Sequence, residues 1–391
     1  MTAARGSDRA GARPTLLVTV RHPGPADCVA AALPSLAADF DVVVLSGELE
    51  RARMERKLCG PGIRHVPAAA PVDALDQLDA TLEAVGPSAC LRTTPAGGCG
   101  PDELLGEAFG RGAAAVPVVA IQDDYGVGDR LDEADAIATV DRDAVDLLDA
   151  PLRERATPIG RLPHDAFVTG ASPAEARRSG RRRLGLDSEP VVLHLTGAGP
   201  AEVEAADLRD VLAAARRARE PAVTVVRPHP RLDDESRAAC RRLVEEAGAQ
   251  RALWADEPGA DRSWLVVADA MLSARSTMNV DSLAFQSAAG GPDGAALSIT
   301  ASVYYRGAVF AAGAGEASAT PLEVRRRGSF VADHGDLEEV LDAALHDGDK
   351  RARRAEEARA WLRPDGLAAE RLVGLVRQNI ASAAAAAEAR R

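Results

Sequence analysis

Thr15-Leu-Leu-Val-Thr-Val20 and Asp41-Val-Val-Val-Leu45 are two short apolar runs, and residues 26–38 between them carry apolar side chains at helical spacing. Runs this short, rich in β-branched residues and bounded by proline or polar turns, are typical of buried strands. The order strand, helix, strand predicts a parallel βαβ unit, because parallel strands need a crossover connection. The chain is therefore predicted to begin with an α/β domain.

The same alternation continues along both halves of the chain. In the first half we expect strands at 88–91, 116–121 and 134–140, and helices at 72–85, 102–110 and 142–148. A second region opens with Pro190-Val-Val-Leu-His-Leu195. It predicts strands at 222–226, 251–254, 270–272 and 295–299, and helices at 201–219, 233–247, 260–267, 276–287 and 349–362. A final helix is expected from about 367.

These patterns predict an α/β protein with two successive domains and C-terminal helices. The expected boundaries are a disordered N-terminus at 1–13, a first domain at 14–165, a linker at 166–189, a second domain at 190–362 and a C-terminal helix and tail at 363–391. The linker includes Arg177-Arg-Ser-Gly-Arg-Arg-Arg183, which is typical of a solvated helix face.

Composition excludes several classes of function. The 391 residues carry a net charge of −12, which argues against bulk nucleic acid as a partner. Six Phe, three Tyr and three Trp are too few for a stacking platform for single strands or long glycans. Five cysteines without a CxxC pair fit reduced thiols. No signal peptide or transmembrane segment is recognisable, so we expect a cytoplasmic protein that could form homo-oligomers.

Ligands of open α/β sheets bind beyond the carboxyl ends of the strands, so the residues that follow each strand are the candidates for a site. Five such segments carry polar or flexible residues: Arg21-His22-Pro23-Gly24, Gln122-Asp123-Asp124-Tyr125-Gly126, Thr196-Gly197-Ala198-Gly199, Arg227-Pro228-His229-Pro230-Arg231 and Ser273-Ala274-Arg275-Ser276-Thr277.

The glycines Gly197 and Gly199 precede a helix, where backbone N–H groups can bind a phosphate; the alternative is a plain turn. The full GxGxxG, GxxxxGK[ST] and HExxH motifs are absent, so we expect no nicotinamide, P-loop or metal chemistry and no cofactor.

The segment from Arg227 to Arg231 places His229 between two prolines and two arginines, which suits an anion; the alternative is a surface loop. Ser276 or Thr277 can cap the next helix and bind a second phosphate, or act as an ordinary cap. Asp281 lies within that helix, where its carboxylate could bind the vicinal hydroxyls of a ribose.

His229-Pro230 and Ser276-Thr277-Met-Asn-Val-Asp281, after a glycine loop, resemble the C-terminal domain of GT-B glycosyltransferases. The resemblance is nearest to the branch of bacterial sialyl- and polysialyltransferases, capsule sugar transferases and CDP-glycerol glycerophosphotransferases. In that branch the HP motif and a serine pair contact the phosphates of the nucleotide donor. Here Ala274-Arg275 replaces the usual aspartate-tyrosine. The resemblance implies two Rossmann-like domains facing a cleft.

The resemblance further implies a transferase, inverting and metal-independent, that moves a sugar from a nucleotide-activated donor to a hydroxyl of a glycan, a lipid carrier or a small natural product. His22 is the first candidate base and Asp124 the second. The expected donor and phosphate ligands are Gly197, Gly199, Arg227, His229, Arg231, Ser273, Arg275, Ser276, Thr277 and Asp281.

Three other functions are compatible with the same residues. A non-hydrolysing nucleotide-sugar epimerase would use Asp123, Asp124 and Asp281 as a carboxylate cluster. A polyol-phosphate transferase would use the same phosphate ligands, and a non-catalytic binding protein would keep the scaffold without turnover.

Overall fold

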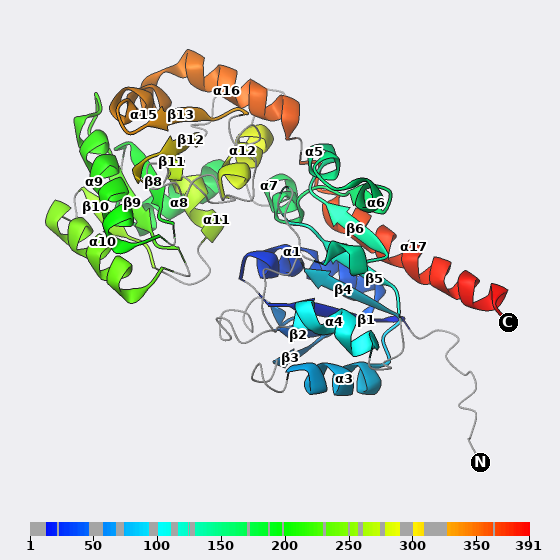
Figure 1. Ribbon diagram of the computed structural model, residues 1–391. Helices are drawn as coiled ribbons and strands as arrows, with labels where there is room; N and C mark the ends of the chain where they lie inside the picture. Colours follow the sequence, from blue (N-terminus) through cyan, green and yellow to red (C-terminus); the bar gives the residue numbers. More distant parts are fainter. Residues whose placement is uncertain are drawn as a thin grey trace. The chain divides into compact units, whose positions relative to one another are not determined.

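The computed structural model describes residues 13–21, 23–46, 58–67, 74–93, 101–110, 116–123, 125, 130–169, 173–186, 188–197, 199–229, 232–248, 251–256, 261–273, 278–289, 300–308, 327–362 and 364–391. The chain forms two compact units (Figure 1). Unit 1 is Met1–Pro163 with Leu367–Arg391, and unit 2 is His164–Gly366.

Unit 1 contains a seven-stranded parallel sheet in the order β3-β2-β1-β4-β5-β6-β7. Its strands are β1 (Thr15–Val20), β2 (Asp41–Ser46), β3 (Ile63–Pro67), β4 (Ala89–Thr93), β5 (Val118–Ile121), β6 (Ala136–Thr139) and β7 (Ala156–Pro158). Its helices are α1 (Pro23–Asp39), α3 (Ala74–Val85), α4 (Pro101–Gly110), η2 (Leu131–Glu133), α5 (Arg142–Asp146), α6 (Ala150–Arg153) and α17 (Ala368–Ala389). The short helix η3 (Leu162–His164) crosses into unit 2.

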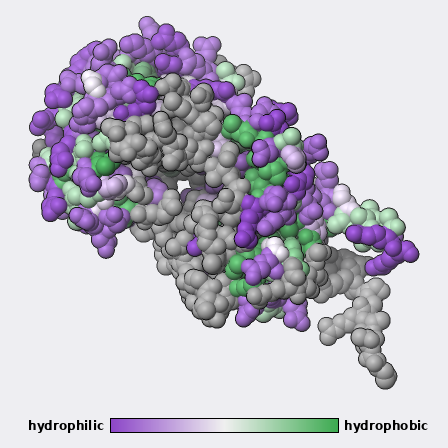
Figure 2. Space-filling model, viewed as in Figure 1, coloured by the Kyte–Doolittle hydropathy of each residue, from purple (hydrophilic) through white to green (hydrophobic). Residues whose placement is uncertain are grey.

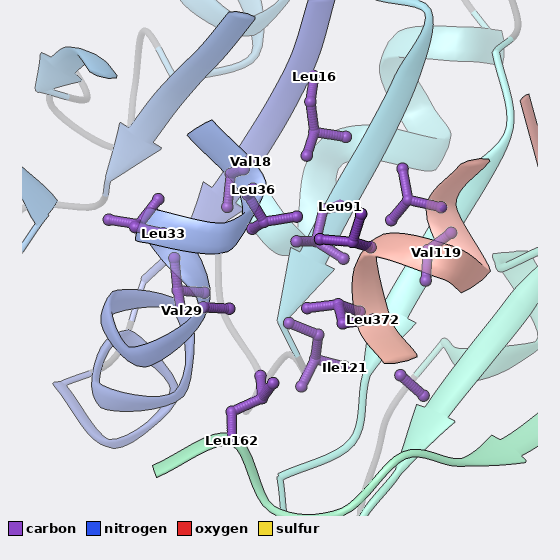
Figure 3. Packing of buried hydrophobic residues seen from close by; sticks show 14 of the residues in the cluster. Leu16, Val18, Val29, Leu33, Leu36, Leu91, Val119, Ile121, Leu162 and Leu372 are labelled. Atoms are coloured by element: carbon purple, nitrogen blue, oxygen red, sulfur yellow. The ribbon is translucent and has the colours of Figure 1, made fainter. Parts of the chain in front are cut away.

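One face of this sheet is covered by helices from opposite ends of the chain. Every second residue of β1 points to this face, as the pleat requires. Figure 3 shows the resulting layer, which includes Leu16 and Val18 of β1, Val29, Leu33 and Leu36 of α1, and Leu372 of α17. Arg377 of α17 also pairs with Asp39 at the end of α1. The C-terminal helix is therefore part of the core of unit 1.

Unit 2 contains a six-stranded parallel sheet in the order β10-β9-β8-β11-β12-β13. Its strands are β8 (Val191–Leu195), β9 (Val223–Arg227), β10 (Ala252–Trp254), β11 (Ala270–Ser273), β12 (Ala301–Arg306) and β13 (Phe330–Asp333). Its helices are α7 (Asp165–Thr169), α8 (Pro173–Arg183), α9 (Ala201–Arg217), α10 (Asp234–Ala247), α11 (Asp261–Val267), α12 (Met278–Ala289), α15 (Leu337–His346) and α16 (Gly348–Trp361).

Both sheets have the strand order of a doubly wound nucleotide-binding fold. In unit 1 the order reverses between β1 and β4, and in unit 2 between β8 and β11. Ligands of such sheets bind at this switch point, outside the carboxyl ends of the strands. The loops that follow β8 and β11 are therefore the place to look for a ligand in unit 2.

The segment expected to be a linker, 166–189, contains α7 and α8, which belong to unit 2. On α8, Arg178 is exposed, in line with the expected solvated face. Arg177 and Arg181, however, form ion pairs with Asp269, and the Asp269 carboxylate also accepts a hydrogen bond of 2.8 Å from the N–H of Val191. One side of the basic segment thus attaches α8 to the amino ends of β8 and β11.

The sequence did not predict β3, β7, β13, α6, α7 or α15. The strand expected at 295–299 falls outside the described residues, and β12 begins just after it at Ala301.

Hydrophilic side chains dominate the described surface of unit 2 seen in Figure 2. Within the parts of the chain that the structure describes, no helix is both long enough and apolar enough to cross a membrane. Cys28, Cys59, Cys90 and Cys240 are free thiols.

Candidate functional site

The loops after β8 and β9 are joined by hydrogen bonds at the carboxyl edge of the second sheet. The N–H of Thr196 donates to the carbonyl of Arg227 at 3.1 Å, and the N–H of His229 donates to Oγ1 of Thr196 at 2.9 Å. The N–H of Leu232 donates to the carbonyl of His229 at 2.9 Å, which closes the turn after β9. His229 and Arg227 are thus presented on a backbone fixed on both sides. Arg231 lies outside the described residues.

The glycine loop after β8 is occupied by a carboxylate of the chain itself. Glu204, in the first turn of α9, accepts hydrogen bonds from the N–H groups of Gly197 and Gly199, both at 2.8 Å. The hydroxyl of Ser236 donates to the carbonyl of Gly199 at 3.2 Å. The N–H groups that the sequence analysis assigned to a donor phosphate therefore bind Glu204 in this structure.

The start of α12 is fixed to the end of β11. The side-chain amide of Asn279 donates to the carbonyl of Ser273 at 3.2 Å, and both residues are buried. The helix N-terminus, with its partial positive charge, therefore lies at the switch point beside β8. Arg275, Ser276 and Thr277, which were expected to bind phosphate here, are outside the described residues.

Asp281 points into the interior of unit 2. Its Oδ1 lies 2.9 Å from Nε2 of His164, and the two side chains are 2% and 4% exposed. The ring of His164 stacks on Phe167 of α7, which makes an edge contact with Phe285 of α12. The carboxylate expected to bind a ribose thus bridges α12 and the beginning of unit 2. Sequence spacing could not reveal its partner, which lies 117 positions away.

In unit 1, the loop after β5 is anchored on both sides of Asp124. A guanidinium N–H of Arg161 donates to the carbonyl of Asp123 at 2.7 Å, and the buried hydroxyl of Tyr125 donates to Oδ2 of Asp141 at 2.6 Å. Burial raises the pKa of Asp141, although its hydrogen bond from Tyr125 acts in the opposite direction. Asp124 itself, like His22 after β1, is outside the described residues.

A charged residue lies at the switch point of the first sheet. Arg92, near the end of β4, has a fully buried side chain that pairs with Glu133 at 3.0 Å and also donates to the carbonyl of Arg130. Arg130 has a left-handed backbone conformation, with φ of 58°. This arginine was not among the predicted site residues, and its position on an apolar strand was the available signal.

His194 is a neutral, buried histidine in β8. Its side chain is 4% exposed, and neither ring nitrogen has a hydrogen-bond partner among the described residues. Burial lowers its pKa to about 4. It is therefore uncharged at neutral pH.

Two further carboxylates of α9 hold the strands next to the switch point. Asp207 accepts a hydrogen bond of 2.5 Å from the N–H of Ala308, after β12. Asp210 lies 3.0 Å from the hydroxyl of Tyr305 and 2.7 Å from Nδ1 of His334. Burial, followed by the hydrogen bond to Asp210, raises the pKa of Tyr305, so it stays a protonated donor. These acids were not among the predicted site residues; their spacing of three residues along one helix was the available signal.

Among the described residues, no group of three or more histidines, cysteines or acids could hold a metal ion.

No protein-family description matches the sequence, and no curated protein matches it either. Solved structures do resemble the fold over nearly its whole length. The UDP-GlcNAc 2-epimerase of Neisseria meningitidis, solved with UDP-GlcNAc, aligns with a TM-score of 0.64 and 12% identity, over 93% of this chain and 100% of the other. The chain has the GT-B fold.

Two other similar structures are a second UDP-GlcNAc 2-epimerase and a glycosyltransferase. The UDP-GlcNAc 2-epimerase of Methanocaldococcus jannaschii aligns with a TM-score of 0.63 and 11% identity, over 93% of this chain and 99% of the other. A glycosyltransferase of Rickettsia africae aligns with a TM-score of 0.59 and 8% identity, over 94% of this chain and 99% of the other. The two Rossmann-like domains expected from the sequence are confirmed. The particular branch that the motifs resemble is not singled out.

Proposed function

We propose that the chain is a GT-B glycosyltransferase that moves a sugar from a nucleotide-activated donor to an acceptor hydroxyl. The observation that carries the proposal is the fixed cationic turn after β9, where the N–H of His229 is bound to Thr196 and Arg227 ends the strand. This turn lies one strand from the switch point, where GT-B sheets are expected to bind nucleotides. The N-terminus of α12 adds a second positive end at the same edge.

In the proposed reaction the acceptor oxygen attacks the anomeric carbon of the sugar while the bond from that carbon to the donor phosphate breaks. The base, His22 or Asp124, takes the proton of the acceptor hydroxyl. Arg227 and His229, together with Arg231, Ser276 and Thr277, stabilise the charge that develops on the leaving nucleotide. This assignment needs no metal, so turnover is expected to survive chelation by EDTA.

Epimerisation of a nucleotide sugar is the second candidate, because two of the similar structures are named UDP-GlcNAc 2-epimerases. As framed from the sequence, this function needs Asp281 to contact the sugar. Asp281 is instead buried against His164. This contact argues against an epimerase that depends on that carboxylate, and it equally removes Asp281 as the ribose ligand of a transferase, whose phosphate ligands are other residues.

The test is a panel of UDP-, CMP-, CDP- and GDP-activated sugars and CDP-glycerol, incubated with the purified protein with and without an acceptor mixture. Acceptor-dependent nucleotide release from a sugar donor supports the proposal. Isomerisation of the donor without release identifies an epimerase, and consumption of CDP-glycerol identifies a polyol-phosphate transferase. Thermal stabilisation by a donor without turnover identifies a binding protein. A parallel series in EDTA, with and without added Mg²⁺, tests the absence of a metal requirement.

A further inference from the structure

The carboxylate of Glu204 accepts backbone N–H groups of a glycine loop before a helix, as a nucleotide phosphate does in loops of this kind. Its side chain is buried, and its two oxygens each accept one N–H, from Gly197 and from Gly199. A Cβ atom built on Gly197 would lie 2.6 Å from Oε1 of Glu204, and one on Gly199 would lie 2.8 Å from it. A side chain at either position would therefore displace the carboxylate from the backbone N–H groups that it accepts.

This contact extends to the turn that carries His229. Gly197 follows Thr196 directly, and Oγ1 of Thr196 accepts the N–H of His229. On the other side, Ser236 binds the carbonyl of Gly199 from α10. Each described residue of the glycine loop is thus held by a partner from α9, α10 or the β9 turn. The carboxylate of Glu204 is therefore one of three groups that bind the loop.

Two further acidic residues lie along α9 after Glu204. Asp207 and Asp210 follow it at intervals of three residues. Asp207 accepts the N–H of Ala308 after β12, and Asp210 accepts the hydroxyl of Tyr305 in β12. A phosphate at the start of α9 would meet this row of carboxylates, and like charges at short distance repel. The favourable potential of a helix N-terminus is therefore already used within the chain.

We propose that Glu204 is a positioning residue, a resident anion that shapes the β8 loop to support His229 and excludes the donor phosphate from the start of α9. The donor phosphate is thereby directed to the β9 turn and the N-terminus of α12. The part that concerns the donor rests on the proposed function; the part that concerns the anion does not.

The first experiment replaces Glu204 with Ala and compares it with Glu202→Ala, which removes an exposed acid from the same turn of α9. Thermal unfolding is followed in sodium acetate and in sodium chloride of equal ionic strength. Acetate supplies the missing carboxylate, so it should raise the melting temperature of E204A by about 3–6 °C at tenfold excess over its dissociation constant. The wild type and E202A should respond equally to both salts. An E204A variant that melts like E202A, or gains nothing from acetate, would overturn the resident anion.

The second experiment measures the affinity for UDP by calorimetry. E204A should bind UDP about tenfold more weakly than the wild type, and acetate should restore the affinity together with the stability. Equal UDP affinity in E204A and wild type would refute the positioning role. Absence of UDP binding by the wild type would count against a UDP donor while leaving the acetate result valid.

If E204A does not fold, Glu204→Gln provides the alternative variant. The amide keeps the volume but can accept only one of the two N–H groups, since its nitrogen is a donor. E204Q should melt below E202A and show no response to acetate, because the space is filled. A melting temperature equal to that of E202A would overturn the proposal.

Discussion

Replacing Asp281 tests whether this carboxylate is structural or binds a ligand. Asp281 of α12 and His164 form a pair with a separation of 2.9 Å, and both side chains are at least 96% shielded from solvent. Asp281→Ala removes the carboxylate and leaves the buried imidazole without this hydrogen bond. Asp281→Asn keeps an oxygen that can accept the N–H of His164 but removes the charge.

The expected losses follow from the burial of the pair. Removing one member of a buried pair costs about 3–5 kcal/mol of unfolding free energy, whereas losing only the charge assistance of the hydrogen bond costs about 1–1.5 kcal/mol. For a unit of roughly 200 residues, each kcal/mol lowers the melting temperature by about 2–4 °C. D281A should therefore melt about 6–20 °C below the wild type, with D281N in between.

Tryptophan fluorescence can measure this loss of stability in unit 2, which contains the pair. The protein has three tryptophans, Trp254, Trp264 and Trp361, and all belong to unit 2. Urea unfolding followed by their emission therefore reports the unit that contains the pair. A double-mutant cycle with His164→Ala should give a coupling energy of about 0.5–3 kcal/mol, because the two residues are in contact.

The reasoning would be refuted if D281A unfolded at the wild-type urea concentration while its affinity for UDP fell. That result would mean that Asp281 faces a ligand, as expected from the sequence. If D281A lost stability but the coupling energy with His164→Ala were close to zero, a contact other than His164 would be responsible for the loss.

The remaining predictions concern donor binding, the base and acid stability. His229→Ala should weaken nucleotide binding tenfold to a hundredfold in calorimetry, about 1.5–3 kcal/mol, with an unchanged melting temperature; equal affinity would exclude His229 from the site. His22→Ala and His22→Asn should each lower kcat by about 10² to 10⁴ with nearly constant donor affinity; if Asp124→Asn alone abolishes turnover, the base is Asp124. His194 is neutral when folded, with a pKa near 4, so the unfolded chain binds its proton first as the pH falls below about 6.5. Unit 2 should therefore lose up to about 3 kcal/mol between pH 6.5 and 4, and His194→Phe should remove this dependence in acid titrations of urea unfolding.

The sequence predicted the elements in which apolar residues predominate. β1 and β8 are dominated by Leu and Val, with at most one polar residue inside each run, and each was placed within a residue of its observed ends. β3, Ile63–Pro67, was missed because its arginine, histidine and proline interrupt the run that identifies a buried strand. β3 is a strand at the edge of the sheet and pairs only with β2, so it is less buried than a central strand and can carry polar residues.

The candidate site was predictable in position but not in its contacts. Strand order placed the β8, β9 and β11 loops at one edge, because alternating strands and helices imply parallel strands. The direction of Asp281 depends on His164 and Phe167, which tertiary packing brings to α12. Likewise, Gly197 and Gly199 match a phosphate loop in sequence, and only the position of Glu204 shows which anion they bind.

The dependence of unit 1 on α17 has a consequence for the order of folding during synthesis. Residues 164–366 form a continuous segment, so unit 2 can fold once that segment is made, as domains generally do. Leu372 and Val376, which are fully buried against the first sheet, are synthesised after all of unit 2. Synthesis of unit 1 therefore begins before that of unit 2 and ends after it, so unit 1 can complete its core only after unit 2 has been made. A nascent chain that stops before residue 367 would expose the apolar face of α1 and β1. We expect such a chain to bind chaperones or to aggregate through this face.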